Sequence, residues 1–307
     1  MHVHDAKTGA VLKYSVFLML ALAAAEAVAG YRTGSLALLS DAGHNFTDSV
    51  ALVLAWFAFY WQSKPATEVK TYGYHRAGVL AAFANAAVLV LLSGYIFYEA
   101  YQRLRNPRPV DAEWMMAVAA IGFVVDAGVS FALLRRSRGD VNVRTAFVHT
   151  AADAASTAGI VVGGWLIQRT GWLQIDPLLS FLIGGLILWS SLDIIHETLN
   201  ILLEGLPRGL KLDTVVAAMR QVEGVEAVHD VHIWSLGSNI HALSSHVAIR
   251  DIPLSESGEI LRRINRMLQE RFRISHTTIQ FESLLCDANH ACFTPADEAV
   301  PEPRRGI

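Results

Sequence analysis

Six long apolar runs limit what this chain can fold into. Each run is about as long as the roughly 20 residues that a helix needs to cross a bilayer. Polar or charged joints separate the runs, which cover residues 12–31, 36–61, 77–101, 113–135, 143–168 and 177–202. Because unpaired backbone polar groups are costly in lipid, this pattern predicts a multi-pass integral membrane protein with an all-α domain of six transmembrane helices.

The composition agrees with a membrane domain joined to a smaller soluble one. The chain has 307 residues, of which 53% are hydrophobic and 17% are charged. Its net charge of -3 gives no basic excess, so nucleic acid is not an expected partner. Both cysteines, Cys286 and Cys292, lie near the C-terminus. They offer no disulfide framework and indicate a reducing compartment.

The distribution of lysine and arginine predicts how the helices are oriented. Positive residues gather in the cytoplasmic joints of membrane proteins. If the N-terminus is inside, the inner joints and flanks hold Lys7, Lys13, Lys64, Lys70, Arg76, Arg135, Arg136, Arg138, Arg144, Arg208 and Lys211, and the outer ones Arg32, Arg103, Arg105, Arg108 and Arg169. This bias predicts that both termini are cytoplasmic, most simply in a bacterial inner (cell) membrane.

Two of the apolar runs each contain a histidine followed four residues later by an aspartate. The pairs are His44 with Asp48 and His149 with Asp153, and this spacing places both side chains on one helix face. Ionisable residues within a membrane helix are costly and mark functional sites. Two imidazoles and two carboxylates together form a ligand set that suits tetrahedral zinc.

The predicted topology allows these four side chains to meet. With six consecutive spans, the second and fifth helices run antiparallel, so His44 lies level with Asp153, and Asp48 with His149. Other polar residues in the apolar runs are Glu26, Asn85 and Asp126. They either orient the histidines or form hydrogen bonds between helices, and the sequence leaves both roles open.

A different pattern begins at about residue 206. Residues 212–224 are typical of an amphipathic helix, 225–237 and 241–251 of alternating strands, 255–272 of a second helix and 276–283 of a third strand. This order predicts a small α+β domain in which the helices cover one face of a sheet. The expected division is a cytoplasmic N-terminal segment, a transmembrane domain, a cytoplasmic domain and a tail, at residues 1–11, 12–205, 206–285 and 286–307.

Several motifs give the chain a specific resemblance. They are SDAGHNFTDSVAL, YGYHRAGVLAAFAN, HTAADAASTAG, LLEGLP and VHDVHIWSL. In these the chain is similar to the cation diffusion facilitator family, in its zinc-transporting branch. The resemblance implies a homodimer, a ferredoxin-like cytoplasmic domain and export of a divalent metal in exchange for protons. It also implies that the family's transport site maps onto His44, Asp48, His149 and Asp153.

The cytoplasmic part offers further metal ligands. His229, His246 and Glu282 occupy positions that resemble a metal site of the family. Beyond them, the chain carries the cluster Cys286, His290 and Cys292, whose thiolates are good zinc ligands; a metal-binding role and a loose tail both remain open for it. For the remaining histidines of the sheet, His232, His241 and His276, a solvated face is the favoured interpretation.

These observations predict a Zn²⁺/H⁺ antiporter that exports zinc from the cytoplasm by alternating access. One alternative is a transporter of another divalent ion, of which Cd²⁺ and Co²⁺ fit the ligands and Mn²⁺ does not. A second alternative is an intramembrane metallohydrolase, with Asp41 as its only candidate base. Four protein ligands leave no open position for a catalytic water, so we do not expect an enzyme.

Overall fold

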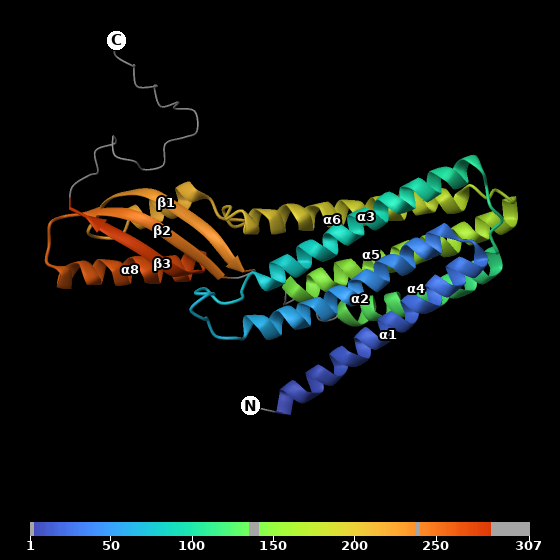
Figure 1. Ribbon diagram of the computed structural model, residues 1–307, viewed down its shortest axis with the longest axis horizontal. Coiled ribbons are helices and arrows are strands. Elements are labelled where there is room, and N and C mark those ends of the chain that lie inside the picture. The colour runs from blue at the N-terminus through green and yellow to red at the C-terminus, as the bar shows by residue number, and fades with distance from the viewer. Residues whose placement is uncertain (1–2, 135–140, 238–239, 284–307) are drawn as a thin grey trace, which may run out of the picture. The chain divides into compact units, whose positions relative to one another are not determined.

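The computed structural model describes residues 3–134, 141–237 and 240–283. The chain divides into two units, one of residues 1–64 and 80–196 and the other of residues 65–79 and 197–307. Long helices form the first, which we call the helical unit, and a small sheet with two further helices organises the second, the α+β unit (Figure 1).

Six long helices match the six predicted runs. They are α1 Val3–Thr33, α2 Leu36–Gln62, α3 Ala77–Arg105, α4 Ala112–Leu134, α5 Val141–Thr170 and α6 Ile175–Leu202. Helix α1 begins at Val3, whereas the apolar run predicted a start at residue 12. Over the described residues, α3, α4, α5 and α6 are long and apolar enough to cross a membrane. Polar residues, Asp48 among them, interrupt the apolar run of α2. The predicted six-helix domain is confirmed.

The helical unit buries a core to which most of its helices contribute. Its members include Leu38 of α2, Leu89 of α3, Met115 of α4, Ile160 of α5 and Ile183 of α6. Many other large apolar side chains face outward, and Leu91, Val124 and Trp189 are all exposed. An apolar exterior around hydrogen-bonded helices is the surface that a lipid bilayer requires.

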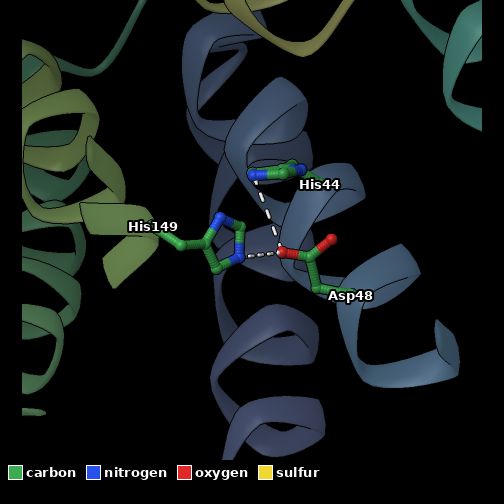
Figure 2. A group of neighbouring side chains, drawn as sticks. All are labelled: His44, Asp48 and His149. Carbon is green, nitrogen blue, oxygen red and sulfur yellow. Dashed lines mark hydrogen bonds and ion pairs between the residues drawn. The ribbon is translucent and has the colours of Figure 1, made fainter. Parts of the chain in front are cut away.

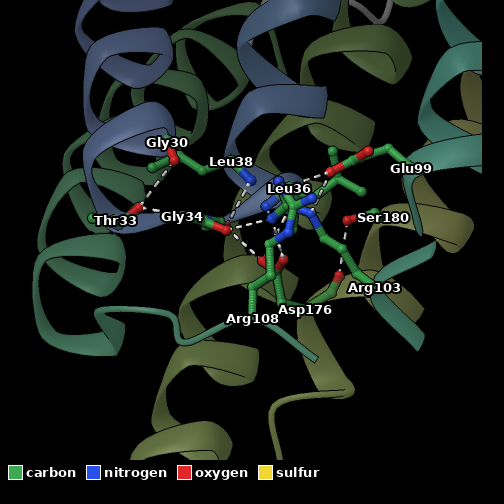
Figure 3. Close-up of polar contacts among 12 residues, drawn as sticks. Gly30, Thr33, Gly34, Leu36, Leu38, Glu99, Arg103, Arg108, Asp176 and Ser180 are labelled. Carbon is green, nitrogen blue, oxygen red and sulfur yellow. Dashed lines mark hydrogen bonds and ion pairs between the residues drawn. The ribbon is translucent and has the colours of Figure 1, made fainter. Parts of the chain in front are cut away.

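A buried carboxylate fixes the start of α2 (Figure 3). Asp176, at the start of α6, is 0% exposed. It accepts hydrogen bonds from Ser35 Oγ at 2.6 Å and from the backbone N–H groups of Leu36 at 2.8 Å and Ala37 at 3.3 Å. The first N–H groups of a helix have no partner within the helix, and a negative charge is favourable there. A side chain of α6 therefore caps α2.

Arg103, near the end of α3, extends this network. Its guanidinium donates to the carbonyl oxygen of Gly34 and, through Nε, to Glu99 Oε1 at 3.0 Å, while Nη1 lies 3.9 Å from Asp176 Oδ2. Gly34 adopts a φ of 73° in the turn between α1 and α2, a conformation that glycine accepts without a steric penalty. The end of α2 that precedes the predicted ligands is thus bound to both α3 and α6.

The α+β unit has the predicted order of elements. These are α7 Leu212–Arg220, β1 Val225–Gly237, β2 Ile240–Ile249, α8 Leu254–Phe272 and β3 Ile274–Glu282. The strands are ordered β1-β2-β3, with β1 and β2 antiparallel and β2 and β3 parallel. A parallel neighbour needs a crossover connection, which α8 supplies. The predicted α+β fold is confirmed.

Alternation along the strands separates a core face from a polar face. Both helices and all three strands contribute to the core, which includes Val215, Met219, Ile233, Leu243, Ile264, Leu268 and Ile274. Val228 and Val247 belong to this core. Successive strand residues point to opposite faces, so their neighbours His229 and His246, which are paired in the β1–β2 register, lie on the other face of the sheet.

The cap on α2 generates a stability prediction. Asp176→Asn places an amide group where three donors require an acceptor, and leaving buried donors unsatisfied costs about 1–3 kcal/mol. We expect the apparent midpoint of thermal unfolding in detergent to fall by about 3–10 °C. Glu113→Gln, an exposed change in the first turn of α4, is the control and should leave the midpoint unchanged. Equal midpoints for both variants would contradict the assignment of Asp176 as a cap.

Candidate metal centre

Helices α2 and α5 bring His44, Asp48 and His149 together (Figure 2), and Asp153 of α5 lies beside the two histidines. His149 Nε2 lies 2.9 Å from Asp48 Oδ2, and His44 Nε2 lies 3.4 Å from Asp153 Oδ1. These two close pairs are the ones that antiparallel helices require. Within each helix the histidine and aspartate are 3.7 Å apart, measured from Nε2 to Oδ2. We call these four residues the quartet.

The separations in the quartet are those of ligands around one small ion. Ligand atoms about 2.0–2.1 Å from zinc at tetrahedral angles lie about 3.3 Å from one another. The four nitrogen–oxygen distances, 2.9, 3.4, 3.7 and 3.7 Å, bracket this value. Each histidine also presents the same ring atom, Nε2, to the carboxylates. The ligand atoms of His44, Asp48 and His149 all lie within 4.8 Å of one another, and oxygens of Asp153 lie 3.4 and 3.7 Å from the two histidines.

The quartet is largely enclosed but opens on one side. The side chains of His44, Asp48 and Asp153 are 15%, 18% and 16% exposed, whereas that of His149 is 50% exposed. His149 and Asp153 also line a cavity of about 160 Å³. An ion held here would be mostly removed from solvent while keeping a route of approach beside His149.

A second cluster lies on the polar face of the sheet in the α+β unit. Glu282 lies close to both predicted histidines. Its Oε2 is 3.1 Å from His229 Nε2, and its Oε1 is 2.8 Å from His246 Nδ1. These buried atoms of His229 and His246, and Glu282 Oε2, nevertheless have no hydrogen-bond partner in the described chain. Atoms that are close but not aligned for hydrogen bonds suit a shared ion, so the three side chains fit a divalent metal.

Asp230 belongs beside this second cluster, although the sequence patterns did not single it out. Its Oδ2 lies 3.7 Å from His246 Nε2 and its Oδ1 lies 3.0 Å from His232 Nε2. Asp230 adopts a φ of 50° within a strand whose register shifts between His229 and His232. Such an irregularity redirects side chains, and regular alternation gives no signal for it.

The remaining sheet histidines have other contacts. His232 contacts Asp230, and His276 contacts the ring of Tyr72. His241 shares a hydrogen bond with Ser235 Oγ. Burial lowers the pKa of His241, and the charge of Arg273 adds to that effect, so its ring stays neutral at pH 7. The cluster of Cys286, His290 and Cys292 lies outside the described residues.

Two of the other polar residues in the membrane helices lie beside the quartet. Glu26 accepts a hydrogen bond from Asn45 at 2.9 Å, and Asp126 accepts one from Thr157 at 3.4 Å. Thr157 also donates to the carbonyl oxygen of Asp153, so it links Asp126 to a quartet helix. Asn85 lies on α3, which contributes no ligand to the quartet.

The helical unit has the apolar exterior of a multi-pass integral membrane protein, and the quartet lies between two of its helices. Residues 12–203 match the family described as cation efflux transmembrane domain, and residues 207–284 match the cation efflux protein, cytoplasmic domain. The chain belongs to this cation efflux family, the cation diffusion facilitators of the sequence resemblance. It is a transporter that exports divalent metal cations, and the metallohydrolase alternative is set aside.

Similar proteins cover nearly the whole chain. The cadmium, cobalt and zinc/H(+)-K(+) antiporter of Bacillus subtilis is 37% identical over 286 residues, 91% of this chain and 92% of that protein. Zinc transporter ZitB of Escherichia coli is 35% identical over 288 residues, 93% and 91% of the two chains. The metal-bound C-terminal domain of the CzcD transporter from Cupriavidus metallidurans is a solved structure with 37% identity and a TM-score of 0.22, covering 24% of this chain and 99% of that one.

The second cluster generates a prediction about metal content. If Glu282 and the two histidines hold an ion, His246→Ala removes one of three ligands and should lower zinc by about one ion per chain. His232→Ala changes a neighbouring, exposed histidine and should leave the zinc content unchanged. The measurement is elemental analysis of the purified full-length variants after equilibration with zinc and removal of the excess. Equal zinc in His246→Ala and wild type would exclude the cluster as a metal site.

Proposed function

We propose that this protein is a Zn²⁺/H⁺ antiporter that exports zinc from the cytoplasm by alternating access. The observation that carries the proposal is the quartet, in which each imidazole Nε2 lies 2.9–3.7 Å from an oxygen of both aspartates, on two membrane helices. Transporters commonly bind their substrate ions near the middle of the membrane between helices.

The donor atoms favour zinc among divalent cations. Histidine nitrogen and aspartate oxygen are ordinary zinc ligands, and four of them complete a tetrahedron. Mg²⁺, Ca²⁺ and Mn²⁺ prefer sites made of oxygen with more ligands. Relatives with 35–37% identity are named as zinc transporters or as cadmium, cobalt and zinc antiporters, which supports zinc as the principal substrate with Cd²⁺ and Co²⁺ as further ones.

Charge balance explains the exchange for protons. With Zn²⁺ bound, two aspartates and two neutral imidazoles give a site with a net charge near zero. Without the ion, Asp48 and Asp153 would leave two bare carboxylates in a medium that penalises charge. Protons on the same nitrogen and oxygen atoms relieve that penalty. Metal and protons therefore compete for one set of atoms, and each leaves as the other arrives.

The direction of transport follows from the proposed orientation. The bias of lysine and arginine toward the joints on the N-terminal side favours cytoplasmic termini in a bacterial inner membrane. We assign residues 12–205 to transport and residues 206–285 to a cytoplasmic ferredoxin-like domain, flanked by an N-terminal segment and a tail. The match to the cytoplasmic domain of the family supports a homodimer held in part by this domain.

The second cluster suits a regulatory role in this scheme. Its ligands come from three strands of the α+β unit, far in sequence from the quartet. An ion bound there stabilises the arrangement of the sheet that brings the ligands together, and a ligand shifts the population toward the state that it binds better. A resident Zn²⁺ at His229, His246 and Glu282 would thus report the zinc concentration of the cytoplasm.

The antiport is tested by measuring both ions at once. The purified protein is placed in sealed vesicles, and Zn²⁺ is added to the outside. Zinc should then enter the vesicles while protons flow out. Asp153→Asn keeps the size of the side chain but removes one carboxylate, so we expect at least a tenfold loss of both fluxes. Glu113→Gln is the matched control and should retain them. Zinc transport without proton movement in the wild type would contradict antiport.

A further inference from the structure

Three acidic side chains lie in the helical unit beside the quartet without belonging to it. Glu26 of α1 is 0% exposed, Asp41 of α2 is 2% exposed, and Asp126 of α4 is half-buried. The negative charges of Asp41 and Asp126 act on each other and on Glu26. These carboxyl groups come from three different helices, so their proximity is a property of the packed bundle.

The position of Glu26 is built for a carboxyl group. Asn45 Nδ2 donates to Oε2 at 2.9 Å. The other oxygen, Oε1, faces Gly122 of α4, where a Cβ atom would lie only 2.7 Å away. Any larger residue at Gly122 would therefore collide with Glu26. The absence of a side chain at Gly122 leaves the space that the carboxyl group fills.

Two buried oxygens in this group lack a partner. Glu26 Oε1 and Asp41 Oδ2 have no hydrogen-bond partner among the described residues. A buried polar atom without a partner costs about 1–3 kcal/mol, and more when it is charged. A proton on the carboxyl group removes the charge and with it most of this cost. The orphaned oxygens thus point to a bound proton as the ligand of this site.

The surrounding charges lead to the same conclusion. The charge of Asp126 acts on Glu26. The charges of His44 and Asp153 act on both Asp41 and Asp126, and that of His149 acts on Asp126. Among the side chains that the structure describes, no lysine or arginine is one of the groups that act most strongly on these carboxyls. Three neighbouring carboxylates without a fixed cation cannot all stay ionised in a low dielectric.

A shared cavity connects this group with the metal site. The cavity of about 160 Å³ is lined by Asn45 and Asp126 as well as by His149 and Asp153. Asn45 donates to Glu26 and therefore stands between Glu26 and the cavity. Charge at the quartet acts on Asp126, and the charge of Asp126 acts in turn on Glu26.

We propose that Glu26, near Asp41 and Asp126, is a proton-binding site separate from the quartet. Glu26 loses its proton when a divalent cation binds to the quartet. The inference rests on the proposed antiport and names a residue that carries an exchanged proton. On metal binding, the O–H bond of the Glu26 carboxyl group breaks and both electrons stay on the oxygen. The proton passes to water in the cavity. The cation and the Asn45 amide stabilise the carboxylate that remains.

Proton release on zinc binding tests this site directly. Calorimetric titration of the full-length protein with Zn²⁺, in two buffers of different ionisation enthalpy, gives the number of protons released per ion. All proteins carry His246→Ala, which removes a ligand of the second cluster, together with Cys286→Ser and Cys292→Ser, which remove the thiols of the tail. Glu26→Gln cannot release a proton, so it should release about one proton fewer than its parent, and its zinc affinity should depend less steeply on pH. Glu113→Gln serves as the control and should match the parent.

The outcomes separate this inference from the antiport itself. If the parent releases protons and Glu26→Gln releases the same number, Glu26 is not a proton site, although antiport stands. If the parent releases none, the proposed antiport fails and this inference fails with it. Should Glu26→Gln not fold, Asn45→Ala retains the carboxyl group but removes the donor that favours its charged form. Half-maximal zinc binding should then move to higher pH, and an unchanged pH profile would overturn the proposal.

Discussion

The free-energy cost of placing charge in an apolar environment determines where ionisable side chains can lie in the helical unit. Ionisable side chains within membrane helices persist only where a partner, an ion or a proton compensates them. The quartet satisfies this condition through two histidine–aspartate pairs at 2.9 and 3.4 Å. In the proposed antiport, the same penalty makes the site alternate between a cation and protons, because bare carboxylates are the costly state.

The rest of the helical unit serves to hold α2, which carries half of the quartet. Asp176 and Arg103 fix the end of this helix nearest to Ser35. A helix that is anchored near its start and bears ligands about 2.5 and 3.6 turns further on can tilt about that anchor. Such a tilt changes access to the ligands without taking their helix out of the bundle.

The sequence predicted the parts of this structure that depend on periodicity. Apolar run lengths located six helices, alternation located three strands, and the four-residue spacing predicted that His44 and Asp48 share a face. It could not predict contacts whose partners are far apart in the chain. Asp176 precedes Pro177 at the start of α6, a position that suggests a cap for its own helix. It instead caps α2, where it accepts from the backbone N–H of Leu36, 140 residues earlier in the chain. The position of Asp230 beside His246 could not be predicted, because it depends on a local irregularity of β1.

The central claim is that the quartet, rather than any other group of side chains, holds the transported ion. Its most direct test is the anomalous scattering of zinc, recorded from crystals of the zinc-loaded full-length protein on both sides of the zinc absorption edge. The account predicts a peak between α2 and α5, with His44, Asp48, His149 and Asp153 each about 2.0–2.2 Å from it. A zinc-loaded protein with a peak at His229, His246 and Glu282 and none at the quartet would contradict it.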